Sequence, residues 1–254
     1  MENNHPKRLD QYLVEHGLVE TRNKAAWMIE QGWVYINGKV QAQKSYKVSA
    51  TDRVELRPDR RIYVSQGGYK LEKAIREFNL DFTGTCIMDV GASTGGFTDC
   101  ALQHGAARVV AIDIGEGQLH PLLAKDERVT SLEKTDIRNI EPADLPVQYP
   151  INIGFDFILV DVSFISLEFV FPFLQKFMAP GVRVVALLKP QFEQAERRKH
   201  KHGIIKSEKV RLSALEKIQA HIFSHGLGVQ QITTTDADGV EKNIEYLLLL
   251  KPEK

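Results

Sequence analysis

Uninterrupted apolar runs in the second half of the chain constrain its fold more than any other feature. Ile158–Val160 and Val184–Leu188 contain no polar residue at alternate positions, so both faces of these strands should be buried. Strands of this kind occur in parallel sheets that are covered by helices on both faces. Segments with helical spacing separate the apolar runs from residue 86 onward. The sequence therefore predicts an α/β domain with a largely parallel sheet between two layers of helices.

The same patterning gives approximate ranges for the elements of this domain. Strands are expected at 86–91, 108–115, 128–136, 155–162, 182–190, 229–235 and 243–251. Helices are expected at 95–104, 117–125, 166–178 and 207–225, and over the segment YKLEKAIREFNL that begins at residue 69.

The first 60 residues have a different pattern, which predicts a small α+β module. Apolar residues recur at helical spacing over 7–18, and Thr21 is placed to cap a second helix. The dipeptide Asn37-Gly38 between alternating residues is a strong signal for a tight hairpin. We therefore expect domains at 1–60 and 69–254, joined by a linker at 61–68 that ends in two glycines.

Charge and cysteine content exclude several classes of protein. The 33 basic and 33 acidic residues cancel, so the net charge does not identify a partner. Two cysteines, Cys86 and Cys100, are too few for a disulfide framework or a multi-cysteine zinc site, and no metal site is expected. The chain begins without an apolar signal segment, and Asp161 and Pro172 interrupt the apolar stretch 157–178. We therefore expect a cytoplasmic protein that does not associate with a membrane.

A glycine-rich turn, DVGASTGG, follows the first strand of the α/β domain. In parallel sheets this turn is the usual ligand site, because ligands bind beside the carboxyl ends of the strands. Gly91 to Gly95 formally match the G-x-S-x-G elbow, which would make Ser93 a hydrolase nucleophile. The turn fits a dinucleotide-binding loop less well, because Ser93 replaces the second glycine. It also resembles the D/E-x-G-x-x-x-G loop of class I methyltransferases that bind S-adenosylmethionine.

Acidic residues at the ends of the following strands favour the methyltransferase interpretation. Asp113 is suited to hydrogen bonding with ribose hydroxyls, and Asp136 can reach an adenine amino group. A hydrolase would need a later histidine in a loop, but the late histidines lie in a basic run or a helix. The residues expected to bind the cofactor are Asp89, Gly91, Ala92, Ser93, Thr94, Gly95, Gly96, Phe97, Asp113, Ile114, Asp136 and Asp161.

Charged residues also interrupt apolar segments where their burial would be costly. Lys189 ends an apolar strand, and Asp161 lies inside FILVDVSFI. Taken alone, Lys189 could extend into solvent and Asp161 could cap a helix. Lys70 could add positive charge nearby, and Glu245, a single acid before an apolar strand, could orient the lysines. Together the four residues form a candidate site for deprotonating and holding a hydroxyl group.

Six collinear segments resemble one protein family over essentially the whole chain. They are GGYKLEKA, DVGASTGGFT, DIGEGQL, LVDVSFISL, LLKPQFE and NIEYLLLL. The chain resembles the TlyA-type family, labelled hemolysins and known as ribosomal RNA 2′-O-methyltransferases. This family joins an S-four-type RNA-binding module to a Rossmann-like methyltransferase domain of the FtsJ/RrmJ group. The chain departs from the related enzymes at Thr94, where they often have proline, and in its more basic segment 193–203.

The resemblance implies S-adenosylmethionine as cofactor and ribosomal RNA in ribosomal subunits as substrate, with cytidine as the target nucleoside. It also implies a catalytic Lys-Asp-Lys-Glu tetrad formed by Lys70, Asp161, Lys189 and Glu245. The RNA-binding residues expected in the N-terminal module are Lys7, Arg8, Arg22, Lys24, Lys39 and Lys44.

Several alternatives remain open at this point. The basic residues of the module could form a solvated surface without bound RNA. The role of the basic run 197–202 is also open, and no protein partner is predicted. As a whole, the chain could be a membrane-active hemolysin, as the family label suggests, or an RNA-binding protein without catalytic activity.

Overall fold

The structure is a computed structural model that describes residues 7–56, 62–145, 154–194, 204–235 and 243–253. The chain divides into two compact units, Met1–Ile62 and Tyr63–Lys254. Residues 63–68, which the sequence places in a linker, lie in the second unit. Tyr63 is buried there, and the first helix of that unit, α3, begins at Gln66. The basic run 197–202 lies outside the described residues.

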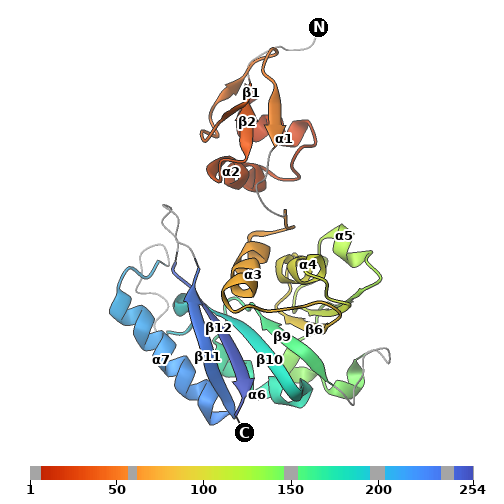
Figure 1. Cartoon of the computed structure of the whole chain (residues 1–254), viewed down its shortest axis with the longest axis vertical. Helices are drawn as coiled ribbons and strands as arrows, with labels where there is room; N and C mark the ends of the chain where they lie inside the picture. The colour runs from red at the N-terminus through yellow and green to blue at the C-terminus, as the bar shows by residue number, and fades with distance from the viewer. Residues whose placement is uncertain (1–6, 57–61, 146–153, 195–203, 236–242, 254) are drawn as a thin grey trace. The chain divides into compact units, whose positions relative to one another are not determined.

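The described residues of the N-terminal unit form two helices and five short strands, which Figure 1 draws. Helices α1 and α2 span Leu9–Glu15 and Arg22–Glu30. One sheet has the order β3-β2-β5, with strands at Lys39–Val40, Val34–Ile36 and Val54–Leu56. The second sheet pairs β1 (Lys7–Arg8) with β4 (Lys47–Val48). The side chain of Thr21 caps α2 by accepting a hydrogen bond from the amide of Lys24. Asn37 and Gly38 both have positive φ, as a type I′ hairpin turn requires.

The second unit is built on a seven-stranded sheet in the order β11-β12-β10-β9-β6-β7-β8 (Figure 1). In chain order the strands are β6 (Cys86–Val90), β7 (Arg108–Ile112), β8 (Val129–Leu132), β9 (Phe155–Val160), β10 (Met178–Leu188), β11 (Leu227–Thr234) and β12 (Tyr246–Pro252). Strands β6 to β10 all run parallel to one another, whereas β12 runs antiparallel to both β10 and β11. This arrangement is the predicted Rossmann-like sheet.

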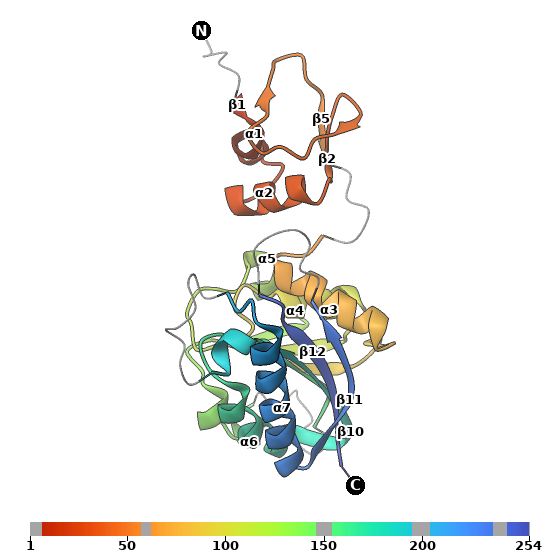
Figure 2. The same ribbon diagram turned by 90° about the vertical axis from the view of Figure 1, so that its left-hand side faces the viewer.

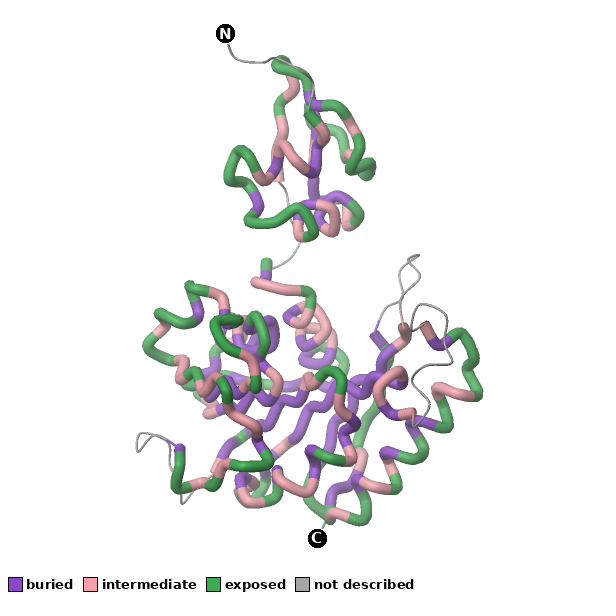
Figure 3. The backbone as a smooth tube through the Cα atoms, turned by 180° about the vertical axis from the view of Figure 1, so that it is seen from behind, coloured by how far each residue is buried: buried purple, intermediate pink, exposed green. Residues whose placement is uncertain are grey.

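Helices cover both faces of this sheet, as the apolar runs predicted (Figure 2). Helices α3 (Gln66–Glu77) and α4 (Gly96–Gln103) pack on one face, against residues such as Ile87 and Leu159. Helices α6 (Phe171–Leu174) and α7 (Glu208–Ser224) pack on the other face, against Ile158 and Val184 among others. In the view of Figure 3 the strands form a buried layer between more exposed helices.

Two predicted helices are shorter in the structure than the sequence suggested. The segment expected as a helix at 166–178 is divided into η3 (Leu167–Phe169), α6 and η4 (Gln175–Phe177). Pro172 lies in the first turn of α6 and lacks the amide that a helix continuing from η3 would use. At 117–125 only α5 (Pro121–Ala124) is helical. Gly117 has φ +63°, which is not helical, and Pro121 lacks the amide that a helix beginning at residue 117 would use. The amides of residues 117–119 bind the Glu133 carboxylate.

Among the described residues, no helix has both the length and the apolar character needed to cross a lipid bilayer.

Candidate active site

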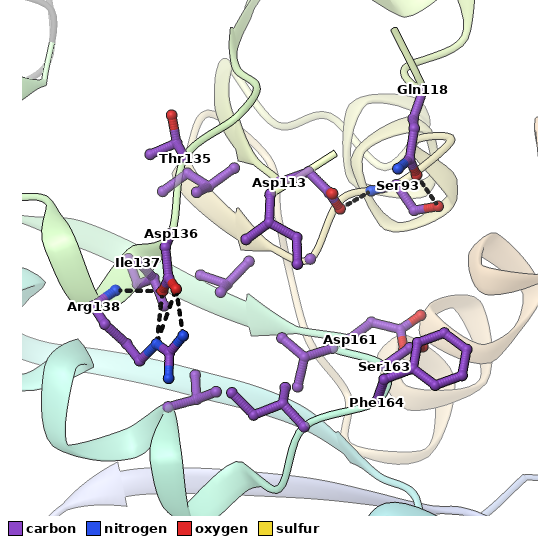
Figure 4. A pocket seen from close by; sticks show the side chains of 17 residues that line it. Ser93, Asp113, Gln118, Thr135, Asp136, Ile137, Arg138, Asp161, Ser163 and Phe164 are labelled. Atoms are coloured by element: carbon purple, nitrogen blue, oxygen red, sulfur yellow. Dashed lines mark hydrogen bonds and ion pairs between the residues drawn. The ribbon is translucent and has the colours of Figure 1, made fainter. Parts of the chain in front are cut away.

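A cavity of about 420 Å³ opens at the carboxyl ends of β6, β7 and β9 (Figure 4). Its walls come from the glycine turn, the segments after β7 and β8, and the loop after β9. The lining residues are Val90, Gly91, Ser93, Ile112, Asp113, Ile114, Gln118, Thr135, Asp136, Ile137, Arg138, Asp161, Val162, Ser163, Phe164, Ile165 and Val170. This volume lies in the range of pockets that hold small ligands or cofactors.

The glycine turn lies close to the backbone of the loop after β9. Gly91 has φ +86°, and a Cβ atom placed on it would lie 2.7 Å from the carbonyl oxygen of Asp161. A side chain at position 91 would therefore be disfavoured both by its backbone conformation and by this contact. Gly95, at φ +93°, begins α4, and Ser93 also has positive φ at +49°. Val90, Gly91 and Ser93 of the turn line the cavity, whereas Ala92, Thr94, Gly95, Gly96 and the following Phe97 are not among its lining residues.

Asp113 joins the glycine turn to the segment after β7. Its carboxylate accepts hydrogen bonds from the amides of Ser93 at 2.8 Å and Gly115 at 2.7 Å (Figure 4). Gln118 continues this wall of the cavity and accepts a hydrogen bond from the Ser93 hydroxyl at 3.2 Å. No histidine is among the described residues that line the cavity, so the lining itself offers Ser93 no imidazole base.

Asp136 and Arg138 form a second polar wall of the cavity (Figure 4). The Asp136 carboxylate accepts hydrogen bonds from the Arg138 side chain at 2.6–2.9 Å and from the Arg138 amide at 3.0 Å. The Arg138 side chain, its hydrogen bonds foremost, holds the pKa of Asp136 below its usual range. Asp136 is thus a carboxylate oriented by its own loop, and Arg138 is a cavity residue that the sequence did not indicate.

Asp89, expected to contact a cofactor, is instead fully buried beneath the glycine turn and does not line the cavity. It accepts a 2.6 Å hydrogen bond from the Thr98 hydroxyl on α4, and its other carboxyl oxygen has no hydrogen-bond partner among the described residues. Burial raises the pKa of Asp89 to about 7, although the Thr98 hydrogen bond opposes that rise. Its position indicates that Asp89 supports the turn by linking the end of β6 to α4.

The four residues of the expected tetrad lie in two ion pairs. Lys189, which follows β10, lies with its Nζ 2.6 Å from Oδ1 of Asp161, which follows β9. Lys70 of α3 donates a 2.7 Å hydrogen bond to Oε2 of Glu245, which precedes β12. The side chain of Lys189 is 9% exposed and that of Asp161 is 19% exposed, so the first pair is largely desolvated.

Three further residues of this region were not indicated by the sequence. The Ser163 hydroxyl accepts a 2.8 Å hydrogen bond from Lys189. Gln191, two residues after Lys189, donates a 3.2 Å hydrogen bond to Glu245 and so connects the loop that carries one ion pair to a member of the other. Phe164 has φ +65° and exposes its ring at the cavity. A serine, a glutamine and a phenylalanine in a loop carry no distinctive sequence signal.

Basic residues expected to bind RNA occupy several settings in the N-terminal unit. Arg8 and Arg22 both bind the buried carboxylate of Asp10, at 3.0 Å and 2.9 Å. Burial alone would raise the pKa of Asp10, but hydrogen bonds from these two arginines hold it below its usual range. Lys7 pairs with Glu15 and Lys24 with Glu20, whereas Lys39 and Lys44 are exposed.

The fold of the second unit occurs in proteins of known structure. A solved structure of an S-adenosylmethionine-dependent methyltransferase from Mesorhizobium loti shares it, with a TM-score of 0.50 and 16% identity, covering 70% of this chain and 95% of that one. At this level of identity the likeness shows a shared fold.

Family models match both units of the chain. The FtsJ-like methyltransferase model matches residues 63–252, and the S4 domain model matches residues 7–54. The chain therefore belongs to the FtsJ-like methyltransferase family, with an S4 domain at its N-terminal side.

Relatives of similar length support this assignment. The 16S/23S rRNA (cytidine-2′-O)-methyltransferase TlyA of Mycobacterium tuberculosis is 35% identical over 250 residues, which cover 97% of this chain and 90% of the relative. Hemolysin A of Brachyspira hyodysenteriae is 38% identical, over 94% of this chain and 98% of the relative. A solved structure from Streptococcus thermophilus that carries a hemolysin name matches with a TM-score of 0.72 and 36% identity, over 99% of this chain and 90% of that one.

Proposed function

We propose that this protein transfers a methyl group from S-adenosylmethionine to the 2′-hydroxyl of a cytidine ribose in ribosomal RNA. The observation that carries the proposal is the largely desolvated Lys189–Asp161 ion pair beside the cavity. The relatives named as rRNA (cytidine-2′-O)-methyltransferases support the choice of substrate. A substrate in ribosomal subunits corresponds to a cytoplasmic location.

The cavity suits the proposed cofactor in size and in polar groups. Position 91 is a glycine and has no side chain, so a ligand can approach the backbone of the turn there. Asp113 is positioned for ribose hydroxyls, and Asp136 with Arg138 offers a polar edge to an adenine. The amides of Ser93 and Gly115 each bind one oxygen of the Asp113 carboxylate, and each oxygen keeps a further lone pair that can accept a ribose hydroxyl.

The chain's own residues would bind and activate the attacking hydroxyl. S-adenosylmethionine supplies a methyl group that is already activated by its sulfonium centre. As an ammonium, Lys189 would hold the 2′-oxygen and stabilise its developing negative charge; it could accept the hydroxyl proton only after losing one of its own. Asp161 and Ser163 would keep the lysine in place. The Lys70–Glu245 pair would complete the network through Gln191. Much of the rate would come from positioning of the hydroxyl.

An assay of methyl transfer tests the proposed function directly. Labelled S-adenosylmethionine would be incubated with the protein and purified small subunits, large subunits or protein-free rRNA. We expect label in ribose, detected as dinucleotides that resist alkaline hydrolysis. Label in bases alone would contradict the proposal, as would failure of every RNA to become labelled by protein that binds the cofactor.

A hemolysin activity is the alternative that two of the similar proteins suggest by name. It would require neither the cavity nor the ion pairs. Dye release from lipid vesicles by the purified protein would support it, particularly if replacement of Lys189 left the release unchanged.

We propose further that the N-terminal unit, which the S4 domain model matches, holds the RNA. This predicts a measurable change in the salt dependence of RNA binding for Arg22→Ala. If Arg22 contacts a phosphate, its loss should lower the slope of log K against log salt by about 0.7–0.9. Asp10 keeps its Arg8 partner in this variant, so the fold should be retained. Arg53→Ala is the matched control, because Arg53 is an exposed arginine of the same unit paired with Glu55. Equal slopes for the two variants, measured by filter binding, would exclude Arg22 from the RNA contact.

A further inference from the structure

Glu193 is a buried carboxyl group to which the proposed chemistry assigns no role. It is only 4% exposed, follows the short helix η5 (Pro190–Phe192) and lies four residues after Lys189. It accepts a hydrogen bond from the Ser166 hydroxyl and a 3.1 Å hydrogen bond from the Leu167 amide. Burial raises the pKa of Glu193, which shows that the surroundings disfavour its charged form. A buried acid of this kind reduces stability unless its hydrogen bonds compensate.

The partners of Glu193 lie on the other loop of the candidate site. Ser166 and Leu167 end the segment 161–167 that begins with Asp161 after β9. Glu193 ends the segment 189–193 that begins with Lys189 after β10. Because β9 and β10 are adjacent parallel strands, these two segments leave the same edge of the sheet.

The two segments are linked at three successive places. At their beginnings, Lys189 binds Asp161 and Ser163. In the middle, the rings of Phe164 and Phe192 lie 5.2 Å apart. At their ends, Glu193 binds the start of η3. Both η3 and η5 also pack against α7.

We propose that Glu193 is a positioning residue for methyl transfer, which fixes the segment 161–167 against the segment 189–193 so that Asp161, Ser163 and Lys189 keep their mutual geometry. The inference rests on the proposed function. The Lys189 and Ser163 side chains meet at 2.8 Å, and loss of the distal link would let the segment that carries Ser163 and Phe164 turn away. Such a displacement acts on the reacting groups, whereas the polar wall formed by Asp113 and Asp136 lies on the segments after β7 and β8.

The test compares Glu193→Ala with Glu193→Gln, which retains an oxygen for the Leu167 amide and an amide that can donate to Ser166. For Glu193→Ala we expect kcat to fall about 10–100-fold, as for a misplaced reacting group. Glu193→Gln should recover most of the lost kcat. Glu168→Gln is the matched control, because Glu168 is a neighbouring acid that pairs with Lys217 outside the cavity lining.

Hydrogen exchange at the Leu167 amide supplies a readout that does not depend on activity. Glu193→Ala should lose protection there, whereas Glu193→Gln and Glu168→Gln should retain it. The proposal is overturned if Glu193→Ala lowers the melting temperature but leaves kcat unchanged, or if the Leu167 amide stays protected. Failure of the wild-type protein to methylate any RNA would instead refute the proposed function, and the exchange measurement would still test the link.

Discussion

Replacement of Lys189 by methionine is expected to lower kcat for methyl transfer by about 10²–10⁴-fold, the contribution typical of a general acid–base group. Methionine has a similar length but can neither hold the 2′-oxygen nor accept its proton. The cofactor Kd should change less than about threefold, because Lys189 is not among the residues that line the cavity. Quenched single-turnover assays with labelled cofactor and saturating RNA would measure the rate constant of the chemical step.

Loss of stability must be separated from loss of chemistry in this variant. Removing one member of a largely buried ion pair leaves Asp161 without its partner, which typically costs about 3–5 kcal/mol when burial is complete. The double variant Asp161→Asn/Lys189→Met removes both charges, so its melting temperature should recover while its kcat stays low. Lys73→Ala is the matched control, since Lys73 also forms an ion pair, with Glu77 on α3. A Lys189→Met enzyme with nearly normal kcat would exclude the proposed role.

Gly91→Ala is expected to lower the melting temperature and to weaken cofactor binding, both by large amounts. A residue with a side chain at φ +86° costs about 1–2 kcal/mol, and the contact with the Asp161 carbonyl adds about 1–3 kcal/mol. For a unit of this size the sum lowers the melting temperature by roughly 4–20 °C. The cofactor Kd should rise about tenfold or more. A tenfold rise corresponds to about 1.4 kcal/mol, which is smaller than the strain that the alanine introduces into the turn.

Gly84→Ala isolates the part of this effect that comes from the backbone conformation. Gly84 has φ +71°, but nothing lies within 4 Å of the Cβ position. Its replacement should lower the melting temperature by only roughly 2–8 °C and leave the cofactor Kd unchanged. Calorimetry could give the same decrease in melting temperature for both variants, and both could keep the wild-type cofactor Kd. In that case the close contact at Gly91 would have no functional consequence.

Long-range features of this fold were accessible from the sequence because they depend on burial. The apolar strands β9 and β10 could be recognised since both faces lack polar residues. Lys189 and Asp161 were identifiable for the same reason, because charges at the ends of such strands require partners. The sequence could not specify that the four candidate residues form two separate pairs, which depends on how α3 and β12 pack on the sheet.

Local features were harder to predict from the spacing of apolar residues. Asp89 alternates with Met88 and Val90, so the strand directs it to the face covered by α4 rather than to the cavity. That geometry was implicit in the strand, but the glycine turn beside it suggested a ligand contact. At 117–125 the helix begins only at Pro121, because Gly117 has a positive φ and Pro121 lacks the amide that an earlier start would use; the spacing of apolar residues reports neither constraint.

The order of synthesis has a consequence for when this protein becomes active. Strand β12 is the last strand in the chain, yet it lies between β10 and β11 rather than at the edge of the sheet. Glu245 immediately precedes β12 and is paired with Lys70, which lies 175 residues earlier. A nascent chain that has not yet emerged as far as β12 therefore lacks both an inner strand and one member of the candidate tetrad. Catalytic competence would be acquired after translation has passed this strand, so premature termination before it would yield inactive protein.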